Sequence, residues 1–220
     1  MKVYVVNLER SVERRLRMAE HLNSIGVPHE FFSAVDGALL PKAEVAQCVG
    51  RWRLTSGEIG CYLSHLAVWR KIVSDGDRCA IILEDDAQLN VDALDALRHL
   101  AAHSECFDVV RLSATEKQVG VEVASLGLQW KLLLPTKNPS GLVGYMVSAQ
   151  GARRLIDRAG SITAPVDTVV DACWQWGGNT VMMVPAPVCQ QSGVDSTIAV
   201  TGRVRRVRRR GFFHRIFVSL

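Results

Sequence analysis

Three adjacent carboxylates, Glu84, Asp85 and Asp86, are the residues best placed for chemistry in this sequence. They follow the apolar run Ala80 to Leu83, which has the composition of a buried strand. In open α/β sheets, ligands bind beyond the carboxyl ends of strands, where these acids fall. Alternation along a strand would put Glu84 and Asp86 on one side and Asp85 on the other. Two converging carboxylates suit Mg²⁺ or Mn²⁺, which could hold a diphosphate as it leaves. The alternative is a solvated turn in which one acid caps a helix.

Further polar groups are expected on the helix that precedes these acids. Thr55 and Glu58 fit a capping box, which opens a helix that reaches about Ser74. One side of it carries the apolar residues Ile59, Leu63, Leu66 and Val73, and another carries Glu58, Tyr62, His65 and Trp69. A lone histidine such as His65 is more often a hydrogen-bonded core residue than a catalyst. A Ser/His hydrolase is disfavoured, because no strand leads through Gly-x-Ser-x-Gly into a helix.

The elements that would position these groups begin with strand, helix and strand. Val3 to Leu8 suits a buried strand, and Ser11 can cap a helix that ends at Gly26. The apolar positions of this helix are Val12, Leu16, Ala19 and Leu22. A second strand, His29 to Val35, closes on the turn pair Asp36-Gly37. This order favours a parallel βαβ unit.

The rest of the chain alternates in the same way. Strands are expected at about 80–83, 107–112, 130–134, 142–148 and 181–184, and helices at about 91–100, 149–158 and 166–176. Segments 38–54 and 115–140 are otherwise irregular, and we expect these long loops to shape the side of the site that carries specificity. There is no internal repeat and no separating linker. The sequence therefore predicts one α/β domain over 1–200, with a mainly parallel central sheet flanked by helices, and a tail at 201–220.

Four segments of the chain resemble glycosyltransferase family 25, the lipopolysaccharide-type sugar transferases, in the family's order. They are Val5-Val6-Asn7-Leu8-Glu9-Arg10-Ser11 with Arg14-Arg15, Gly57-Glu58-Ile59-Gly60-Cys61-Tyr62-Leu63-Ser64-His65, Ile82-Leu83-Glu84-Asp85-Asp86, and Gly144-Tyr145-Met146-Val147-Ser148 with Gly151-Ala152. The resemblance covers most of residues 1–190. It implies a GT-A-like fold, a UDP-sugar donor (most often UDP-galactose), a saccharide or glycolipid acceptor, and a divalent metal, Mn²⁺ or Mg²⁺.

The same resemblance implies roles for single residues. Glu84-Asp85-Asp86 would take the place of the family's Asp-x-Asp-like motif, with Glu at the first position. Asp86 would bind the metal, Glu84 the metal or the ribose, and Asp85 would be a second ligand or would hold the loop. Ser64 and His65 are candidates to orient donor phosphates or sugar hydroxyls. Gln190, in a short closing match, is a candidate donor contact.

Donor-binding candidates also follow the first two strands. Asn7 and Arg10 leave the end of the first strand, close to the expected nucleotide pocket. Arg14 and Arg15 continue onto the helix, where one of them could reach a phosphate or where both could lie on a solvated face. Asp36 could bind uracil or ribose, although Asp-Gly is also a common turn.

The family counts as inverting, and an inverting transfer needs a carboxylate base for the acceptor hydroxyl. Asp167, in Pro165-Val166-Asp167, is the first candidate, and Asp171, one helical turn later, is the second. The alternative for Asp167 is that it caps the helix that follows.

Composition limits where the protein acts. The 220 residues are 48% hydrophobic and 22% charged, and no apolar run approaches the roughly 20 residues of a membrane span. The start of the chain reads as a strand and is too short for a signal peptide. Six scattered cysteines without a C-x-x-C pair indicate buried thiols in a reducing cytosol and argue against a zinc site.

The net charge of +4 belongs to the C-terminal tail. Residues 201–220 hold seven arginines and no acid, so the rest of the chain has 19 basic against 22 acidic residues. Arginines mixed with Phe212, Phe213 and Phe217 suit contact with an anionic membrane surface through 202–220. A nucleic-acid-binding arm is the less favoured alternative. A cytoplasmic enzyme, peripheral at the inner face of a bacterial inner membrane, is the expectation.

Two other classes of function remain open from the residues. A carboxylate-metal phosphohydrolase would use the same acids, without a nucleotide sugar. A non-catalytic membrane- or nucleic-acid-binding protein on a transferase-like fold would depend on 202–220 and not on Asp86.

Overall fold

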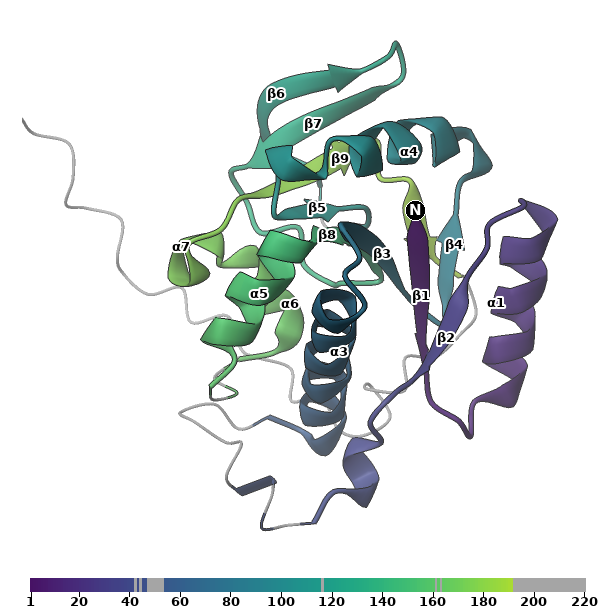
Figure 1. The fold of residues 1–220 in the computed structure, drawn as a ribbon, viewed down its shortest axis with the longest axis vertical. Helices are drawn as coiled ribbons and strands as arrows, with labels where there is room; N and C mark the ends of the chain where they lie inside the picture. The colour runs from purple at the N-terminus through teal and green to yellow at the C-terminus, as the bar shows by residue number, and fades with distance from the viewer. Residues whose placement is uncertain are drawn as a thin grey trace, which may run out of the picture.

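One eight-stranded sheet forms the centre of the protein, in the order β2-β1-β3-β8-β5-β9-β7-β6 (Figure 1). The computed structural model describes residues 1–41, 43, 45–46, 54–115, 117–160, 162 and 164–191. The strands are β1 (Lys2–Asn7), β2 (Glu30–Ser33), β3 (Cys79–Glu84), β5 (Val109–Arg111), β6 (Gly120–Leu126), β7 (Trp130–Pro135), β8 (Gly144–Ser148) and β9 (Thr180–Val184). A separate antiparallel pair joins β4 (Ala87–Leu89) to β10 (Val188–Gln190).

Most strands of the large sheet point the same way. β2, β1 and β3 are parallel neighbours, and β8 runs antiparallel between β3 and β5. β9 is parallel to β5, β7 is antiparallel to β9, and β6 is antiparallel to β7. Only β8 and β7 therefore oppose the other six strands. The expected α/β architecture, with a mainly parallel sheet flanked by helices, is confirmed.

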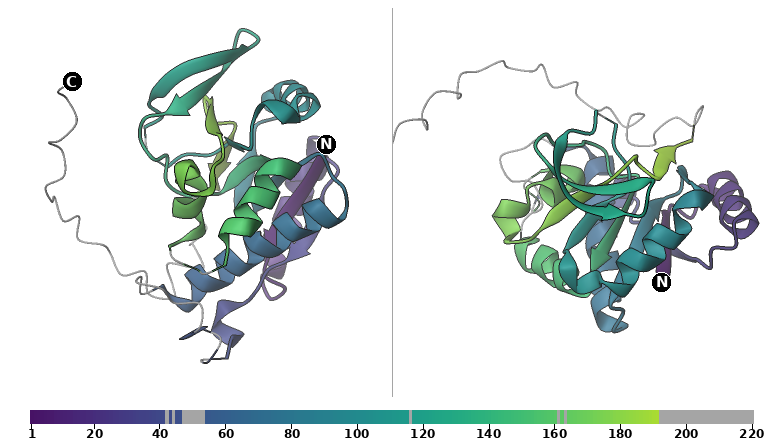
Figure 2. Two further views of the ribbon diagram at one scale, coloured as in Figure 1. Left: turned by 60° about the vertical axis from the view of Figure 1, so that its left-hand side comes forward. Right: turned by 90° about the horizontal axis from the view of Figure 1, so that it is seen from above.

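Helices cover both faces of the sheet, as the views in Figures 1 and 2 show. They are α1 (Val12–Ser24), α3 (Ser56–Ser74), α4 (Leu94–Ala102), α5 (Ala149–Arg158), α6 (Val166–Asp171) and α7 (Cys173–Trp176), with short 3₁₀ turns at Gly37–Leu39, Val91–Ala93 and Ser104–Cys106. Among the described residues, every helix is too short or too polar to span a lipid bilayer.

Alternate residues of the central strands build two separate cores. Val3, Ile81 and Leu83 pack with α1 and α4 on one face of the sheet. Tyr4 and Ile82 pack with α3, α5, α6 and α7 on the other face. This alternation is the two-residue period of a strand that is buried on both sides. Because both of their faces are covered, β1 and β3 lie in the middle of the fold. Their carboxyl ends lie next to each other on one side of the sheet.

Two expectations for elements differ from the structure, and a third concerns residues that the structure does not describe. The segment 115–140 contains a full hairpin, because β6 pairs with β7. The expected helix to Trp176 is two short helices, α6 and α7. The tail at 201–220 lies outside the described residues.

Candidate active site

The site begins where β1 and β3 end side by side. Val6 is in register with Glu84, so Asn7 lies next to the acids that follow β3. The Asn7 side-chain amide donates a hydrogen bond to Asp85 Oδ2 at 2.7 Å. Asn7 thus lies behind the acid run and holds its loop.

Arg14 binds two of the three acids at once. Its guanidinium lies 2.9 Å from Asp85 Oδ1 and 2.7 Å from Asp86 Oδ2, and all three side chains are largely buried. The Gln190 amide also donates to Asp86 Oδ2, at 2.9 Å. The strand ends at Glu84, and Asp85 and Asp86 form a turn. The alternation expected for these acids therefore fails, because Asp85 and Asp86 share one arginine while Glu84 faces α3.

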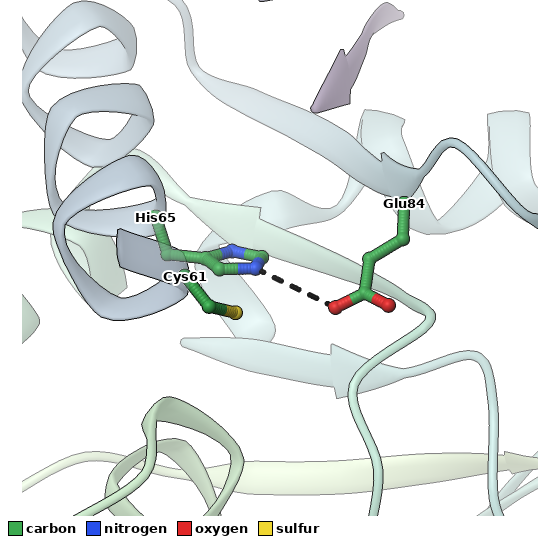
Figure 3. A group of neighbouring side chains, drawn as sticks. All are labelled: Cys61, His65 and Glu84. Carbon is green, nitrogen blue, oxygen red and sulfur yellow. Dashed lines mark ion pairs between the residues drawn. The ribbon is translucent and has the colours of Figure 1, made fainter. Parts of the chain in front are cut away.

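Glu84 lies opposite a buried histidine of α3. His65 Nε2 is 4.0 Å from Glu84 Oε1, and Cys61 is one helical turn before His65 (Figure 3). His65 Nδ1 is hydrogen-bonded to the Tyr145 hydroxyl at 2.9 Å, which accepts a second bond from Trp69 Nε1 at 2.8 Å. His65, Trp69 and Tyr145 are fully buried. The histidine is thus fixed by the core on one side and faces the acids on the other.

Burial sets the charge of this pair. Desolvation, together with the neighbouring charges of Asp86 and Asp85, raises the pKa of Glu84 to about 8. Desolvation also lowers the pKa of His65 to about 4. The imidazole is therefore neutral at pH 7, and Glu84 is a carboxyl group that exchanges its proton near neutrality.

The other wall of the site is a backbone contact between α3 and the turn after β2. Ser64 Oγ accepts a hydrogen bond from Val35 N at 2.8 Å and donates one to Gly60 O at 2.7 Å. A Cβ on Gly60 would lie 2.6 Å from Gly37 N, and one on Gly37 would lie 1.7 Å from Ser56 O. Only glycine permits so close an approach of two backbones.

Asp36 and Arg10 face each other at the rim of the same wall. Asp36 caps the turn at Gly37–Leu39 by accepting a hydrogen bond from Ala38 N, and it forms an ion pair with Arg10. The Arg10 side chain is about half exposed. Both groups are thus at the opening of the site and can be reached by a ligand.

Two clefts meet at Glu84. The first holds about 720 Å³ of open space and is lined by Arg10, Arg14, Asp36, Ser64, His65 and the three acids. The second holds about 700 Å³ and is lined by Glu58, Thr115, Gly141, Asp167 and Gln190, among others. Cys61 and Glu84 line both clefts, so these two residues form the partition between them.

The two candidate bases have different surroundings. Asp167 faces the second cleft and accepts hydrogen bonds from Thr168 N at 2.7 Å and Gly141 N at 3.3 Å. Asp171 is 4% exposed and pairs with buried Arg111 at 3.0 Å. Burial raises the pKa of Asp171 to about 7. Asp171 lines neither cleft, and its contacts are those of a structural ion pair.

The acids leave room for a divalent ion. Asp86 Oδ2 is held by Arg14 and Gln190, but Oδ1 is buried and has no hydrogen-bond partner. Among the described residues, Glu84 has no lysine or arginine within ion-pair distance. Mg²⁺ and Mn²⁺ need only one or two carboxylates when phosphate oxygens and water complete the shell. Asp86 and Glu84 therefore each offer a carboxylate oxygen that such an ion could bind.

Two residues of the site had no predicted role. Tyr145 is buried and in register with Ile82 of β3, so it joins α3 to the sheet beside the acids. Arg111 is the one charged residue of β5 and donates to Ser140 O at 3.0 Å and also to Gly141 O. An arginine inside an apolar strand was the available signal, because a buried guanidinium needs a buried acid.

Comparisons with known proteins point to one family. The model of glycosyltransferase family 25 (LPS biosynthesis protein) matches residues 1–170. A glycosyltransferase 25 family member of Aedes aegypti is 29% identical over 173 residues, which are 70% of this chain and 28% of that protein. A putative glycosyltransferase of Haemophilus influenzae is 28% identical over 174 residues, 77% of this chain and 61% of the relative. The chain thus spans less than two thirds of either relative.

Other relatives differ in what their names say. Procollagen galactosyltransferase 1 of Danio rerio is 28% identical over 70% of this chain and 29% of its own length. A Bos taurus relative at the same identity is named a probable inactive glycosyltransferase 25 family member. A crystal structure of a glycosyltransferase involved in the glycosylation of the major capsid of PBCV-1 superposes with a TM-score of 0.51 at 6% identity. It covers 91% of this chain and 95% of its own, which supports the fold alone.

Proposed function

Because this chain belongs to glycosyltransferase family 25, we propose that it transfers a sugar, galactose first among the candidates, from a UDP-sugar to a saccharide or glycolipid acceptor. The observation that carries the proposal is the pair of clefts that meet at Glu84, at the carboxyl end of β3. A transferase has to bring two substrates together at one bond, and each cleft supplies room for one of them.

The first cleft is the donor site of this proposal. Arg10 and Asp36 at its rim are candidates for the nucleotide, since both offer charged groups at the opening. Ser64 and His65 form its inner wall and Arg14 and Asp85 its floor, while Asn7 supports Asp85 from behind. Arg14 is paired with two carboxylates, so its role is to hold the acid loop in place.

A divalent ion, Mn²⁺ or Mg²⁺, would be held by Asp86 and Glu84. It would supply positive charge to the diphosphate as the bond to the sugar breaks. Gln190 orients Asp86 by its hydrogen bond to Oδ2, which leaves Oδ1 for the ion.

The second cleft is the acceptor site, with Asp167 as the base. In an inverting transfer, an acceptor hydroxyl oxygen bonds to the anomeric carbon while the bond to the diphosphate breaks on the opposite side. The hydroxyl proton passes to a carboxylate, and Asp167 faces this cleft with two backbone N–H groups to hold it. Asp171 is the less suitable base, because it is paired with Arg111 behind the cleft.

Calorimetric titration of UDP-galactose tests the proposal. We expect binding with Mn²⁺ present, loss of binding with EDTA, and at least a 10-fold weaker affinity in Asp86→Asn. Asp157→Asn is the matched control, because Asp157 is an exposed carboxylate of α5 outside both clefts. UDP-glucose and UDP-N-acetylglucosamine test the choice of sugar, and an acceptor screen by UDP release follows.

Each contrary result would exclude a different part of the proposed function. A UDP-galactose affinity that changes neither with EDTA nor in Asp86→Asn would exclude the metal role, but it would still be compatible with a transferase. Release of phosphate from simple esters, without any UDP-sugar binding, would favour a phosphohydrolase. No ligand and no hydrolysis would place the chain with the relatives that are named probably inactive.

A further inference from the structure

Three unlike side chains converge at the partition between the clefts. Cys61 and His65 are one turn apart on α3 and therefore share a side of the helix. Glu84 reaches them from the end of β3 (Figure 3). Their ligand atoms, a thiol sulfur, an imidazole nitrogen and a carboxylate oxygen, all lie within 4.8 Å of one another.

The histidine is oriented as a metal ligand would be. Metal-bound histidines are held through their second ring nitrogen, and His65 Nδ1 is bonded to Tyr145 at 2.9 Å. Tyr145 is itself fixed by Trp69, so the ring cannot turn away. The other nitrogen, Nε2, is buried without a hydrogen-bond partner and points at Glu84.

The proton arrangement around Tyr145 allows this role. Trp69 can only donate, so the tyrosine oxygen accepts from it. The second lone pair of that oxygen can accept from Nδ1–H of His65, which leaves a lone pair on Nε2. A cation between Nε2 and the Glu84 carboxylate would then satisfy both groups.

We propose that Cys61, His65 and Glu84 bind a thiophilic divalent cation such as Zn²⁺. Thiolate and imidazole are ligands that Zn²⁺ and Co²⁺ prefer, whereas Mg²⁺ and Mn²⁺ prefer oxygen. The C-x-x-C spacing that the sequence lacks is not needed here, because an i, i+4 pair on a helix and one strand-end acid supply three ligands. This site shares Glu84 with the expected Mn²⁺ or Mg²⁺ site and differs from it in the two ligands from α3, Cys61 and His65.

The charge of the surroundings also favours a cation. Glu84 lies beside Asp85 and Asp86, which both pair with Arg14, and among the described residues no lysine or arginine lies within ion-pair distance of Glu84. Three protein ligands leave a fourth position open, as in zinc sites that bind a further molecule. Cys61 and Glu84 line both clefts, so this position is within reach of solvent.

One consequence rests on the proposed function. Glu84 belongs both to this group and to the expected Mn²⁺ or Mg²⁺ site, so the two cations compete for it. Zn²⁺ would then inhibit sugar transfer, and excess Mn²⁺ would relieve the inhibition.

Cobalt absorption tests the site directly, without any sugar donor. We expect one equivalent of Co²⁺ to give a near-ultraviolet thiolate-to-cobalt band in the full chain, which Zn²⁺ abolishes. Cys61→Ser should remove the band and weaken cobalt binding at least about 100-fold, since loss of even an outer partner costs 10- to 100-fold. Tyr145→Phe should weaken binding about 10-fold with the band retained, because it removes only the partner of Nδ1.

Cys189→Ser and Cys106→Ser are the controls, since both cysteines are exposed. Their bands should match the unmodified chain. A band that survives Cys61→Ser, or that disappears with either control, would overturn the proposal. So would cobalt binding without a thiolate band. Because no UDP-sugar is present, any of these results leaves the proposed transfer untouched.

Discussion

Arg14 is the residue on which the acid loop depends. It is the arginine that pairs with both Asp85 and Asp86, and its side chain is 12% exposed. Removing a buried partner leaves uncompensated charges in the protein interior. The residue is therefore structural first, and its effect on any ligand follows from the position of the acids.

We expect Arg14→Ala to lower the free energy of unfolding by about 3 kcal/mol. Urea denaturation measures this change. Arg17→Ala is the control on the same helix, because its pair with Glu13 is exposed and should contribute nothing measurable. Equal midpoints for the two variants would contradict the role of Arg14.

The two acids of α6 should separate activity from stability. Asp167→Asn keeps an oxygen for its backbone donors, so we expect unchanged urea unfolding and a kcat about 10² to 10⁴ times lower. Asp171→Asn breaks a buried ion pair, so it should lower the free energy of unfolding by about 3 kcal/mol.

Rates of UDP release with a working acceptor, beside unfolding curves, distinguish these two variants. If Asp171→Asn unfolded like the unmodified protein but had lost activity, Asp171 and not Asp167 would be the base. A kcat unchanged in both would mean that neither acid takes the proton.

The position of the acids could be predicted from the sequence, but their partners could not. Glu84 to Asp86 follow an apolar strand, which local pattern shows. The contact of Gln190 with Asp86 depends on β10 pairing with β4, 101 residues apart at Cys189 and Gln88. Such long-range pairing leaves no local signal.

At the scale of elements, α3 has the better-defined start. Thr55 and Glu58 exchange both bonds of a capping box, whereas Ser11 at the start of α1 makes no side-chain bond. We therefore expect Thr55→Ala to cost about 1 kcal/mol in unfolding free energy and Ser11→Ala to cost nothing measurable. Thermal and urea unfolding of both variants check this. A larger loss at Ser11 would mean that α1 is capped differently.

The inward face of α1 was predicted correctly at Leu22 but wrongly at Val12 and Leu16, for a physical reason. Val12 and Leu16 are exposed, while Met18 and Leu22 are buried. The buried face continues through Arg14, four residues before Met18, and ends on the acids. A hydrophobic pattern assigns every charged residue to the surface. Because the buried face of α1 includes an arginine, the pattern places that face at the wrong residues.

Strand β6 was not predicted, because neither of its faces is well buried. It is the edge strand of the sheet, and Val121 and Val123 are exposed together. Alternation of apolar and polar residues arises only where one side packs on a core. The sequence alternates only over Val121-Glu122-Val123, which is too short a run to predict a strand.

For the whole molecule, the α/β class followed from the order of elements, but the strand directions did not. The strand at 142–148 was expected, yet nothing local shows that β8 runs against both its neighbours. Direction is decided by the connections on either side of it, through segment 115–140 and α5. The domain limits at 1–200 stay a prediction.

The arginine-rich tail gives a prediction for the intact chain. We propose that residues 202–220 bind anionic membranes, since seven arginines alternate with bulky apolar residues there. Co-sedimentation with vesicles of about one third phosphatidylglycerol should show binding that weakens with salt and is lost on deletion of 202–220. UDP-sugar binding should remain. Binding to an oligonucleotide instead of vesicles would favour the nucleic-acid alternative.

The glycine contact between Gly37 and Gly60 limits how the first cleft can move. The two backbones approach so closely that one added methyl group would collide, and Ser64 ties them together. The turn after β2 and the start of α3 must therefore shift as one stiff unit. Among the described residues at this rim, Arg10 is the one with a half-exposed side chain that could move over a bound molecule. One wall of the cleft is therefore rigid before a ligand binds, and the loss of conformational freedom on binding falls on the Arg10 side chain.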